Sequence, residues 1–225
     1  MRFFDAEAVD ATLTFPVLVD ALEAAHRRPP IVIADTMIGE EQSMYFVRNA
    51  VDPGRFAASK LVTSIPANAY RGDLPAVQAV VVVFDADDGR PLAVIDGTTL
   101  TRWRTAADSA LGARLLARPD ARTLLVIGAG AMARPLARAH VSVRPAIERV
   151  LVLNRTPDRA AAVVADLVAE GLPAEVAGDL PAAVGTADVI SAATRATEPL
   201  ILGADLRPGT HVDLVGGFTP ATRET

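Results

Sequence analysis

Residues 123–155 read TLLVIGAGAMARPLARAHVSVRPAIERVLVLNR, and this stretch decides the fold. A short apolar run at 124–127 leads directly into the sequence Gly-Ala-Gly-Ala-Met-Ala. A helix-like segment follows, and a second apolar run occupies 150–153. Strand, glycine-rich turn, helix and strand in this order are typical of one half of a sheet that binds a dinucleotide. The pattern therefore predicts a Rossmann domain in an α/β protein.

The glycines of this turn have separate roles in the expected site. Gly128 permits the tight turn after the strand, and Gly130 lets backbone N–H groups approach a pyrophosphate. Ala133 stands where the motif has its third glycine, and the helix N-terminus offers partial positive charge to the phosphates. The alternative is a glycine turn in an ordinary α/β protein without a ligand, and the flanking strand and helix patterns favour the binding site.

The end of the second strand indicates which dinucleotide is bound. It reads Asn154-Arg155-Thr156, with Arg159 shortly afterwards and no acidic residue before Asp158. A carboxylate here would bind the 2′-hydroxyl of NAD(H), whereas an arginine can hold the 2′-phosphate of NADP(H) by charge-assisted hydrogen bonds. We therefore expect NADPH rather than NADH. The alternative is an exposed arginine in a turn.

Composition narrows the class of protein. The 225 residues are 51% hydrophobic with a net charge of −5, and their dispersed basic residues argue against binding to nucleic acid or to an anionic membrane. The chain has no cysteine and three scattered histidines, so we expect neither thiolate chemistry nor a metal site. No signal-like N-terminus and no apolar run of about 18 residues is present, which predicts a cytoplasmic protein.

The first part of the chain has the pattern of an α+β domain. Residues 14–28 read as a helix, and short β-like runs follow at 31–34, 44–47, 57–63, 79–84 and 92–95. Residues 85–90, rich in Asp and Gly, predict a hairpin loop between the last two runs. Successive strands without intervening helices indicate an antiparallel sheet with a helix against it.

The second part continues the Rossmann pattern. We expect a turn at 96–99 and an alanine-rich helix at 100–117 that carries the chain between the domains. Further helices and strands are then expected at 159–170, 174–177, near 180–185, at 189–193 and at 211–215. The sequence therefore predicts two domains, an α+β substrate-binding and dimerisation domain at 1–110 and a dinucleotide-binding domain at 111–225.

Three basic residues could contact a substrate. Arg48 and Lys60 lie in or after expected strands of the first domain, and Arg104 lies near the start of the connecting helix. Each could equally be a surface residue. Together they supply cationic groups suited to a carboxylate-bearing substrate beside a nicotinamide.

Other candidates lie at the ends of Rossmann strands. Thr194 and Gly216 follow two of these strands, at the carboxyl ends where ligands bind in doubly wound sheets. Asp188 and Asp213 are more simply explained as turn and strand-end residues.

Several phrases together resemble the ornithine cyclodeaminase/mu-crystallin family over nearly the whole chain. They are residues 60–68 (KLVTSIPAN), Asp96-Gly97, Leu100-Thr101, residues 104–107 (RTAA), residues 128–130 (GAG), residues 154–156 (NRT), residues 196–199 (ATEP), residues 215–217 (VGG) and Arg223-Glu224. The resemblance implies a homodimer formed by the first domain, and it implies that Arg48, Lys60 and Arg104 hold a substrate carboxylate. It also implies a set of residues that line the cofactor: Arg104, Thr105, Gly128, Gly130, Ala131, Met132, Asn154, Arg155, Thr156, Arg159, Thr194 and Val215.

Two departures from the family pattern refine this expectation. Ornithine cyclodeaminases have an aspartate after the Gly-Gly pair, where this chain has Phe218. The change argues against ornithine as the substrate and makes the chain more similar to the ketimine reductases of the family. Members of the family also continue well beyond the Arg-Glu phrase, whereas this chain stops at Thr225. We therefore expect the C-terminal part of the family fold to be absent.

The expected function is NADPH-dependent reduction of a cyclic ketimine carboxylate, Δ1-pyrroline-2-carboxylate or Δ1-piperideine-2-carboxylate, to L-proline or L-pipecolate. Arg48 and Arg104 would clamp the carboxylate, and Lys60 is the candidate catalytic residue that supplies a proton to the ring nitrogen. One alternative is an ornithine cyclodeaminase or an alanine-type amino-acid dehydrogenase. Another is a non-catalytic protein that binds NADPH, similar to mu-crystallin.

Overall fold

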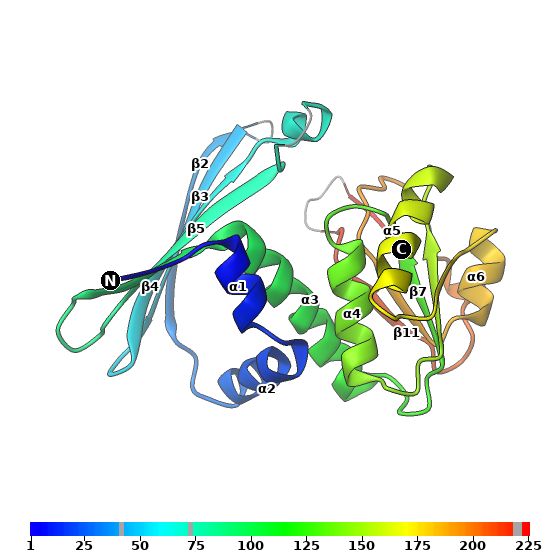
Figure 1. Ribbon diagram of the computed structural model, residues 1–225, viewed down its shortest axis with the longest axis horizontal. Coiled ribbons are helices and arrows are strands. Elements are labelled where there is room, and N and C mark those ends of the chain that lie inside the picture. The colour runs from blue at the N-terminus through cyan, green and yellow to red at the C-terminus, as the bar shows by residue number, and fades with distance from the viewer. Residues whose placement is uncertain (41–42, 72–73, 218–221) are drawn as a thin grey trace. The chain divides into compact units, whose positions relative to one another are not determined.

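The apolar run that precedes the glycine turn forms β7 (Thr123–Ile127), the middle strand of a five-stranded parallel sheet (Figure 1). Its strand order is β11-β10-β7-β8-β9. The other strands are β8 (Arg149–Leu153), β9 (Ala174–Val176), β10 (Val189–Ala192) and β11 (His211–Leu214). If the five strands are numbered 1 to 5 in chain order, their order across the sheet from β9 to β11 is 3-2-1-4-5, as in the Rossmann fold.

Alternating residues of β7 pack into two hydrophobic clusters, one on each face of this sheet. Leu124 and Val126 pack with residues of α4 (Ala133–Val143) and α5 (Pro157–Ala169). Leu125 and Ile127 pack with residues of α6 (Leu180–Thr186). Since successive side chains of a strand point to opposite faces, a run that is apolar at every position requires helices on both faces. Burial of each large side chain stabilises the fold by about 2 kcal/mol.

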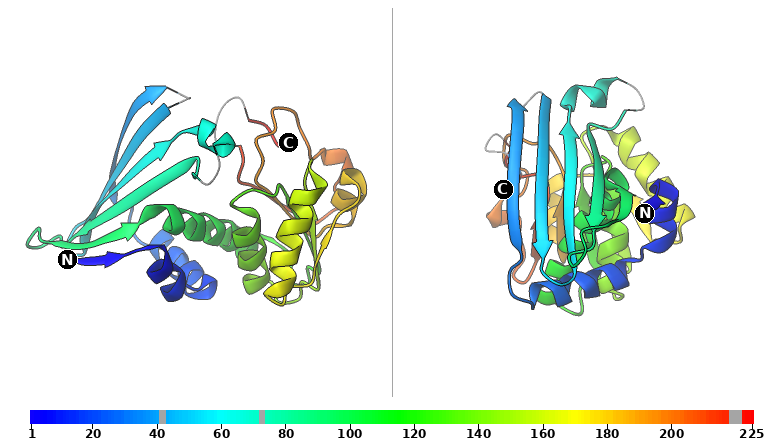
Figure 2. Two further views of the ribbon diagram at one scale, coloured as in Figure 1. Left: turned by 45° about the horizontal axis from the view of Figure 1, so that its top comes forward. Right: turned by 90° about the vertical axis from the view of Figure 1, so that its left-hand side faces the viewer.

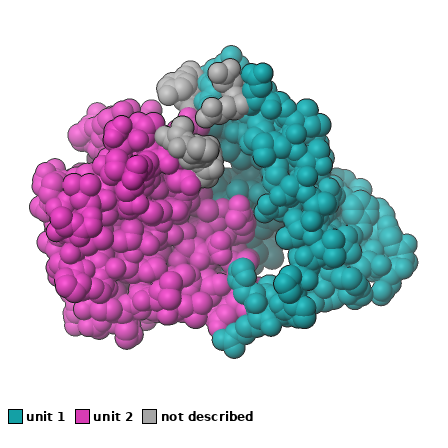
Figure 3. All heavy atoms as spheres, turned by 180° about the vertical axis from the view of Figure 1, so that it is seen from behind, with its two compact units in different colours: residues 1–14, 24–103 teal, residues 15–23, 104–225 magenta. Residues whose placement is uncertain are grey.

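The structure is a computed structural model that describes residues 1–40, 43–71, 74–217 and 222–225. It divides into two compact units, coloured separately in Figure 3. Unit 1 comprises residues 1–14 and 24–103, and unit 2 comprises residues 15–23 and 104–225. Two helices belong partly to each unit, α2 (Phe15–His26) and α3 (Gly97–Leu116). Short 3-10 helices occur at Pro66–Tyr70 and Gly203–Asp205.

A six-stranded sheet of order β1-β6-β5-β4-β3-β2 forms most of unit 1, and Figure 2 shows its long strands side by side. The strands are β1 (Arg2–Phe4), β2 (Val32–Glu40), β3 (Ser43–Asp52), β4 (Phe56–Ser64), β5 (Val77–Phe84) and β6 (Pro91–Asp96). All neighbours are antiparallel except β1 and β6, which are parallel. The predicted class, a Rossmann domain with an α+β unit, is confirmed.

Three details of unit 1 differ from the sequence predictions. The sequence did not predict β1 or α1 (Ala6–Thr12), whose N-terminus is capped by the Asp5 carboxylate. The strands expected at 31–34 and 44–47 extend through 32–40 and 43–52. The turn expected at 96–99 is wrong, because α3 begins at Gly97 directly after β6. The Asp96 carboxylate accepts a hydrogen bond from the Thr99 N–H over 2.7 Å, as a helix N-cap does.

The loop between β5 and β6 agrees with the hairpin prediction. The Asp85 N–H donates to the Arg90 carbonyl over 3.0 Å, and the Asp85 carboxylate accepts from the Asp87 N–H over 2.9 Å. Gly89 adopts a φ of +74°, which a side chain would disfavour. Among the described residues, no helix has the length and apolar character that crossing a membrane requires.

Candidate functional site

The glycine turn follows β7 at the carboxyl end of the parallel sheet. Gly128 has a φ of +109°, and its N–H donates to the Leu153 carbonyl over 2.8 Å. A Cβ atom at Gly128 would lie 2.7 Å from the Ala193 carbonyl oxygen, so both the backbone conformation and the space require glycine. The turn is therefore held against two neighbouring strand ends, those of β8 and β10.

The second glycine and the start of α4 leave backbone groups accessible. Gly130 and Ala131 are exposed, and a Cβ atom at Gly130 would meet no atom within 4 Å. Met132 is the N-cap of α4, where no side chain caps the helix and no acidic residue occupies the first turn. First-turn N–H groups and the helix dipole attract anions, and a phosphate fits this arrangement.

Asn154 connects the end of β8 to the glycine turn. Its Oδ1 accepts a hydrogen bond from the Ala129 N–H over 3.3 Å, and its Nδ2 donates to the Thr156 carbonyl over 3.0 Å. The Asn154 side chain therefore links the end of β8 to the glycine turn. Arg155 and Arg159 are exposed, and in the described part of the chain neither forms a salt bridge.

Residues of α3 and β11 line a cavity of about 510 Å³ in unit 2. It brings together two predicted cofactor residues, Thr105 and Val215, and Arg104 lies beside Thr105 on the exposed surface of α3. The sequence did not single out the other residues that line it: Asp108, Ser109, Leu111, Gly112, Leu115, His211, Val212 and Leu214. Their place around the cavity depends on the helical register of α3 and on the pairing of β11, which a linear pattern does not show.

Asp213, in the middle of β11, also lines this cavity and belongs to a buried polar cluster. Its Oδ2 accepts a hydrogen bond from the Ser191 hydroxyl over 2.6 Å and lies 3.4 Å from Nε2 of His140, whose side chain is fully buried. Burial acts to raise the pKa of the Asp213 carboxyl, but His140 and the hydroxyls of Ser191 and Ser109 outweigh it, so the pKa lies below its ordinary value. Its place inside the strand differs from the strand-end position that the sequence suggested.

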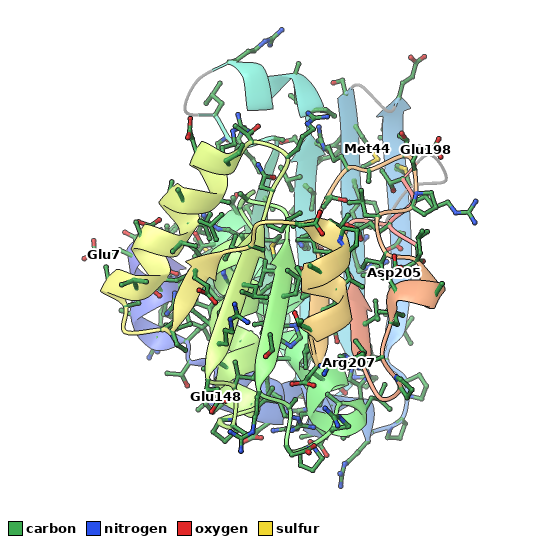
Figure 4. All side chains as sticks on the ribbon, turned by 90° about the vertical axis from the view of Figure 1, so that its right-hand side faces the viewer. Glu7, Met44, Glu148, Glu198, Asp205 and Arg207 are labelled. Atoms are coloured by element: carbon green, nitrogen blue, oxygen red, sulfur yellow. The ribbon has the colours of Figure 1, made fainter. Side chains whose placement is uncertain are left out.

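Asp188 has the structural role that the sequence favoured. Its carboxylate accepts hydrogen bonds from the N–H groups of Arg122 and Thr123 over 2.9 and 3.0 Å, and it pairs with Arg118 and Arg207. Figure 4 shows Arg207 at the end of the unit 2 sheet where its strands begin, with Glu198 at the opposite end. This cluster joins the amino ends of the strands, away from the glycine turn.

Two of the three predicted substrate residues are neighbours in unit 1. Arg48 of β3 lies directly opposite Lys60 of β4, so both side chains emerge on the same face of the sheet. Arg48 is exposed and Lys60 is half-buried. Arg104 belongs to unit 2.

The sequence did not predict the partner of Arg48. Asp35 of β2 lies opposite Arg48 and receives hydrogen bonds from its Nε and Nη2 over 2.9 and 2.7 Å. These bonds hold the pKa of the Asp35 carboxyl below its ordinary value. Only the register of β2 against β3 reveals the pair, since Asp35 and Arg48 are 13 residues apart in the sequence.

Thr194 and Val215 follow β10 and β11, at the same edge of the sheet as the glycine turn. The Thr194 side chain and backbone both donate to the carboxylate of Glu224, which the sequence noted only as part of a family phrase. Phe218 lies outside the described residues. In the ranges that are described, no three His, Cys, Asp or Glu side chains are grouped as a metal site would require.

Comparison with known proteins places the chain among enzymes. The sequence profile of the ornithine cyclodeaminase/mu-crystallin family matches residues 30–225. A Delta(1)-pyrroline-2-carboxylate reductase of Paracoccus denitrificans is 47% identical over 219 residues, which cover 96% of this chain and 68% of that protein. The chain therefore spans about two thirds of the length of this relative.

Several solved structures match this chain over its whole length, and two of them have bound nicotinamide dinucleotides and TM-scores near 0.9. The Thermococcus litoralis Delta(1)-pyrroline-2-carboxylate reductase in complex with NADH and L-proline is 27% identical with a TM-score of 0.89, over 71% of its own chain. An archaeal alanine dehydrogenase dimer with bound NAD is 25% identical with a TM-score of 0.88, over 70% of its chain. The family predicted from the sequence phrases is confirmed. The chain belongs to the ornithine cyclodeaminase/mu-crystallin family.

Proposed function

We propose that this protein reduces a cyclic ketimine carboxylate with NADPH, converting Δ1-pyrroline-2-carboxylate or its six-membered homologue to L-proline or L-pipecolate. The observation that carries the proposal is 47% identity to a pyrroline-2-carboxylate reductase over 96% of the chain. The oxidoreductase class follows from these relatives, and a nicotinamide dinucleotide agrees with the NADH and NAD of the solved structures. The specific substrate and the preference for NADPH are parts of the proposal.

Unit 2 binds the dinucleotide in this proposal. The first turn of α4 and the exposed backbone of Gly130 and Ala131 receive the pyrophosphate. Arg155 and Arg159, which form no salt bridge in the described structure, receive the 2′-phosphate of the adenosine half. When bound, the dinucleotide supplies the hydride that the imine carbon accepts.

Arg48 and Lys60 of unit 1 bind the substrate carboxylate in this proposal. Their cross-strand pairing presents two cations on one face of the sheet. Arg48 uses Nε and Nη2 for Asp35, and its Nη1 is not part of that pair. A guanidinium has donors on all three nitrogens, so Arg48 can keep Asp35 and still bind an oxygen of the substrate.

Lys60 also supplies the proton that the ring nitrogen gains when the imine carbon accepts hydride. It is the only lysine in the chain, whose other cationic side chains are arginines apart from three histidines. An arginine holds its proton at any working pH, whereas a lysine can release one when its environment lowers its pKa. In this proposal Arg48 therefore serves only to pair with the carboxylate, whereas Lys60 both contacts the carboxylate and supplies the proton.

The protein is a homodimer in this proposal, formed through the sheet of unit 1. One row of this sheet, on the face opposite Arg48, has Val47, Leu61 and Val80 at its centre, all half-exposed, between Thr36 and Asp96 at its two ends. Val82 continues the apolar surface on the same face. Half-exposed aliphatic side chains on adjacent strands are typical of a surface that a second copy covers. The similar alanine dehydrogenase is described as a dimer.

The test is an assay of cyclic imines with NADPH and NADH separately, following the absorbance of the reduced nicotinamide. We expect turnover of Δ1-pyrroline-2-carboxylate or Δ1-piperideine-2-carboxylate, faster with NADPH. Lys60→Ala should lose both substrate affinity and turnover. Lys60→Arg should keep the KM for the imine and lose turnover, because it retains the charge without a transferable proton.

Three results would contradict the proposal. Ammonia release from alanine or ornithine with NAD(P)+, without imine reduction, would indicate a dehydrogenase or cyclodeaminase. Tight binding of NADPH with no turnover of any imine would indicate a binding protein. Activity of Lys60→Ala within about two-fold of the parent would remove Lys60 from the catalytic step.

A further inference from the structure

The Glu224 carboxylate joins the carboxyl ends of two strands in unit 2. Glu224 is buried, with only 2% of its surface exposed. Oε1 accepts hydrogen bonds from the backbone N–H and the hydroxyl of Thr194 over 2.7 and 2.8 Å. Oε2 accepts from the Gly216 N–H over 2.8 Å. One buried carboxylate therefore satisfies two backbone N–H groups that lie just beyond β10 and β11.

The backbone around Glu224 is itself held in place. The N–H groups of Leu200 and Ile201 both donate to the Glu224 carbonyl over 3.0 Å, and the Arg223 N–H donates to the Ala196 carbonyl over 2.6 Å. Ile201 is buried in the hydrophobic cluster under the sheet. The carboxylate is therefore presented from a segment that is attached at both backbone and core, so its position is defined before any ligand binds.

Gly216 makes room for this carboxylate. A Cβ atom at Gly216 would lie 2.2 Å from the Thr194 carbonyl oxygen and 2.5 Å from Oε1 of Glu224. Its neighbour Gly217 would meet nothing within 4 Å. Of the two glycines that end the phrase at 215–217, only Gly216 is required by packing, and the requirement comes from Glu224 and Thr194.

Thr194, which Glu224 fixes by hydrogen bonds, in turn packs against the glycine turn. The Thr194 hydroxyl donates to Glu224 and accepts from the Ala196 N–H over 3.2 Å, which sets the rotamer of the side chain. The Thr194 methyl carbon would lie 3.4 Å from a Cβ atom at Gly128, and the Ala193 carbonyl would lie 2.7 Å from it. The glycine turn therefore packs against Ala193 and Thr194 at the end of β10, and Glu224 fixes the position of Thr194 by hydrogen bonds.

We propose that Glu224 is a positioning residue for the dinucleotide site, which orders Thr194 and the Val215–Gly216 backbone around the glycine turn. It acts through these groups and does not itself contact the dinucleotide. The inference rests on the proposed function, because it assumes that the carboxyl edge of the sheet binds a dinucleotide. Ordering these groups in advance removes an entropic cost from binding.

The test is Glu224→Gln, measured by fluorescence titration with NADPH at a temperature where the variant is folded. An amide has one acceptor oxygen and a donor nitrogen, so its NH2 must face a donor at Thr194 or Gly216. We expect the Kd for NADPH and the KM for NADPH to rise about ten-fold or more, while the KM for the imine changes less than about three-fold. Glu175→Gln is the matched control. It makes the same chemical change at the exposed partner of Arg149, and NADPH affinity should stay within about two-fold.

If Glu224→Gln does not fold, a second pair of variants tests whether Glu224 positions the dinucleotide site. Gly216→Ala displaces the carboxylate while Glu224 remains, and it should weaken NADPH binding in the same way. Gly217→Ala adds the same methyl group where there is space and should leave binding unchanged. A folded Glu224→Gln, or failing that a Gly216→Ala, that binds NADPH within about two-fold of the parent would overturn the inference alone. A parent that binds neither NADPH nor NADH would overturn the proposed function and this inference with it.

Discussion

The Oδ1 atom of Asn154 accepts a hydrogen bond from the Ala129 N–H over 3.3 Å, which connects the tip of β8 to the glycine turn after β7. The other end of the same amide, Nδ2, binds the Thr156 carbonyl. One side chain thus sets the spacing between the loop expected to bind the pyrophosphate and the loop expected to bind the adenosine ribose.

Replacing Asn154 by leucine should weaken dinucleotide binding. The leucine has a similar shape but makes neither hydrogen bond. If the binding free energy becomes less favourable by about 1–2 kcal/mol because the two loops are less ordered, the Kd for NADPH rises about 5- to 30-fold. Isothermal titration measures this. An unchanged Kd would show that the two loops keep their spacing without Asn154.

Neutralising Arg155 should reduce the preference for NADPH over NADH. We expect Arg155→Gln to raise the Kd for NADPH about ten-fold and the Kd for NADH less than about two-fold, because only NADPH has the 2′-phosphate. Arg122→Gln is the control, since it removes the same charge at the amino end of β7. Equal losses for both dinucleotides would argue against a contact with the 2′-phosphate.

Arg144 should stabilise the end of α3. Its Nη2 lies 2.7, 2.7 and 2.8 Å from the carbonyl oxygens of Ala113, Arg114 and Ala117, in the last turn of the helix and just beyond it, where carbonyl groups run out of helical N–H partners; the Ala113 carbonyl also accepts from the Ala117 N–H. Arg144→Met should lower the free energy of unfolding by about 2 kcal/mol in urea denaturation. Arg149→Met, which breaks an exposed pair with Glu175, should cost less than about 0.5 kcal/mol.

Stability should fall as the pH drops below the ordinary pKa of histidine. Burial lowers the pKa of His211 from 6.5, the neighbouring His140 and Arg144 lower it further, and Asp213 opposes them. The unfolded chain therefore takes up the proton first, so stability contributed by neutral His211 is full above pH 6.5 and is lost as the pH falls toward its pKa in the fold.

Urea midpoints between neutral and mildly acidic pH measure this dependence. Because glutamine does not titrate, His211→Gln should flatten the curve in that window. At more acidic pH both proteins should still lose stability, since the pKa of Asp213 lies below its ordinary value and its contribution disappears as the carboxylate is protonated. An equal slope in parent and variant would assign the dependence to other groups.

A charge on the apolar face of unit 1 should prevent dimerisation. Leu61 is in the middle of the row with Val47 and Val80, so Leu61→Glu would place a carboxylate inside the proposed interface. Analytical ultracentrifugation should show a dimer for the parent and a monomer for the variant, with unchanged circular dichroism. Val168→Glu, at an exposed position of α5, should remain dimeric. A monomeric parent would contradict the proposed dimer.

Local patterns were sufficient for the Rossmann unit. The run at 124–127 is apolar at every position because helices cover both faces of β7, and the glycine turn needs the φ of Gly128. Such signals reside within a few residues, so the order of strands and helices could be predicted. The phrase Asp96-Gly97-Thr98-Thr99 misled the prediction, because an aspartate followed by glycine is equally compatible with a turn and with the capped start of α3.

The contacts of the candidate site could not be predicted in the same way. Asp35 meets Arg48 because two long strands pair in one register, and a shift by one residue would put them on opposite faces. Strand β1 has three residues and exists because it pairs with β6, about 90 positions later in the chain. No short pattern contains that information.

The sequence by itself determined the family, the α/β class and the position of the glycine turn, because each depends on residue type and local spacing. Only the tertiary structure decided that Arg48 pairs with Asp35 on one neighbouring strand and lies opposite Lys60 on the other. It also decided that the Glu224 carboxylate accepts hydrogen bonds from backbone N–H groups just beyond β10 and β11. These contacts join residues distant in sequence, and they exist because pairing and packing of whole strands bring single side chains within hydrogen-bond distance.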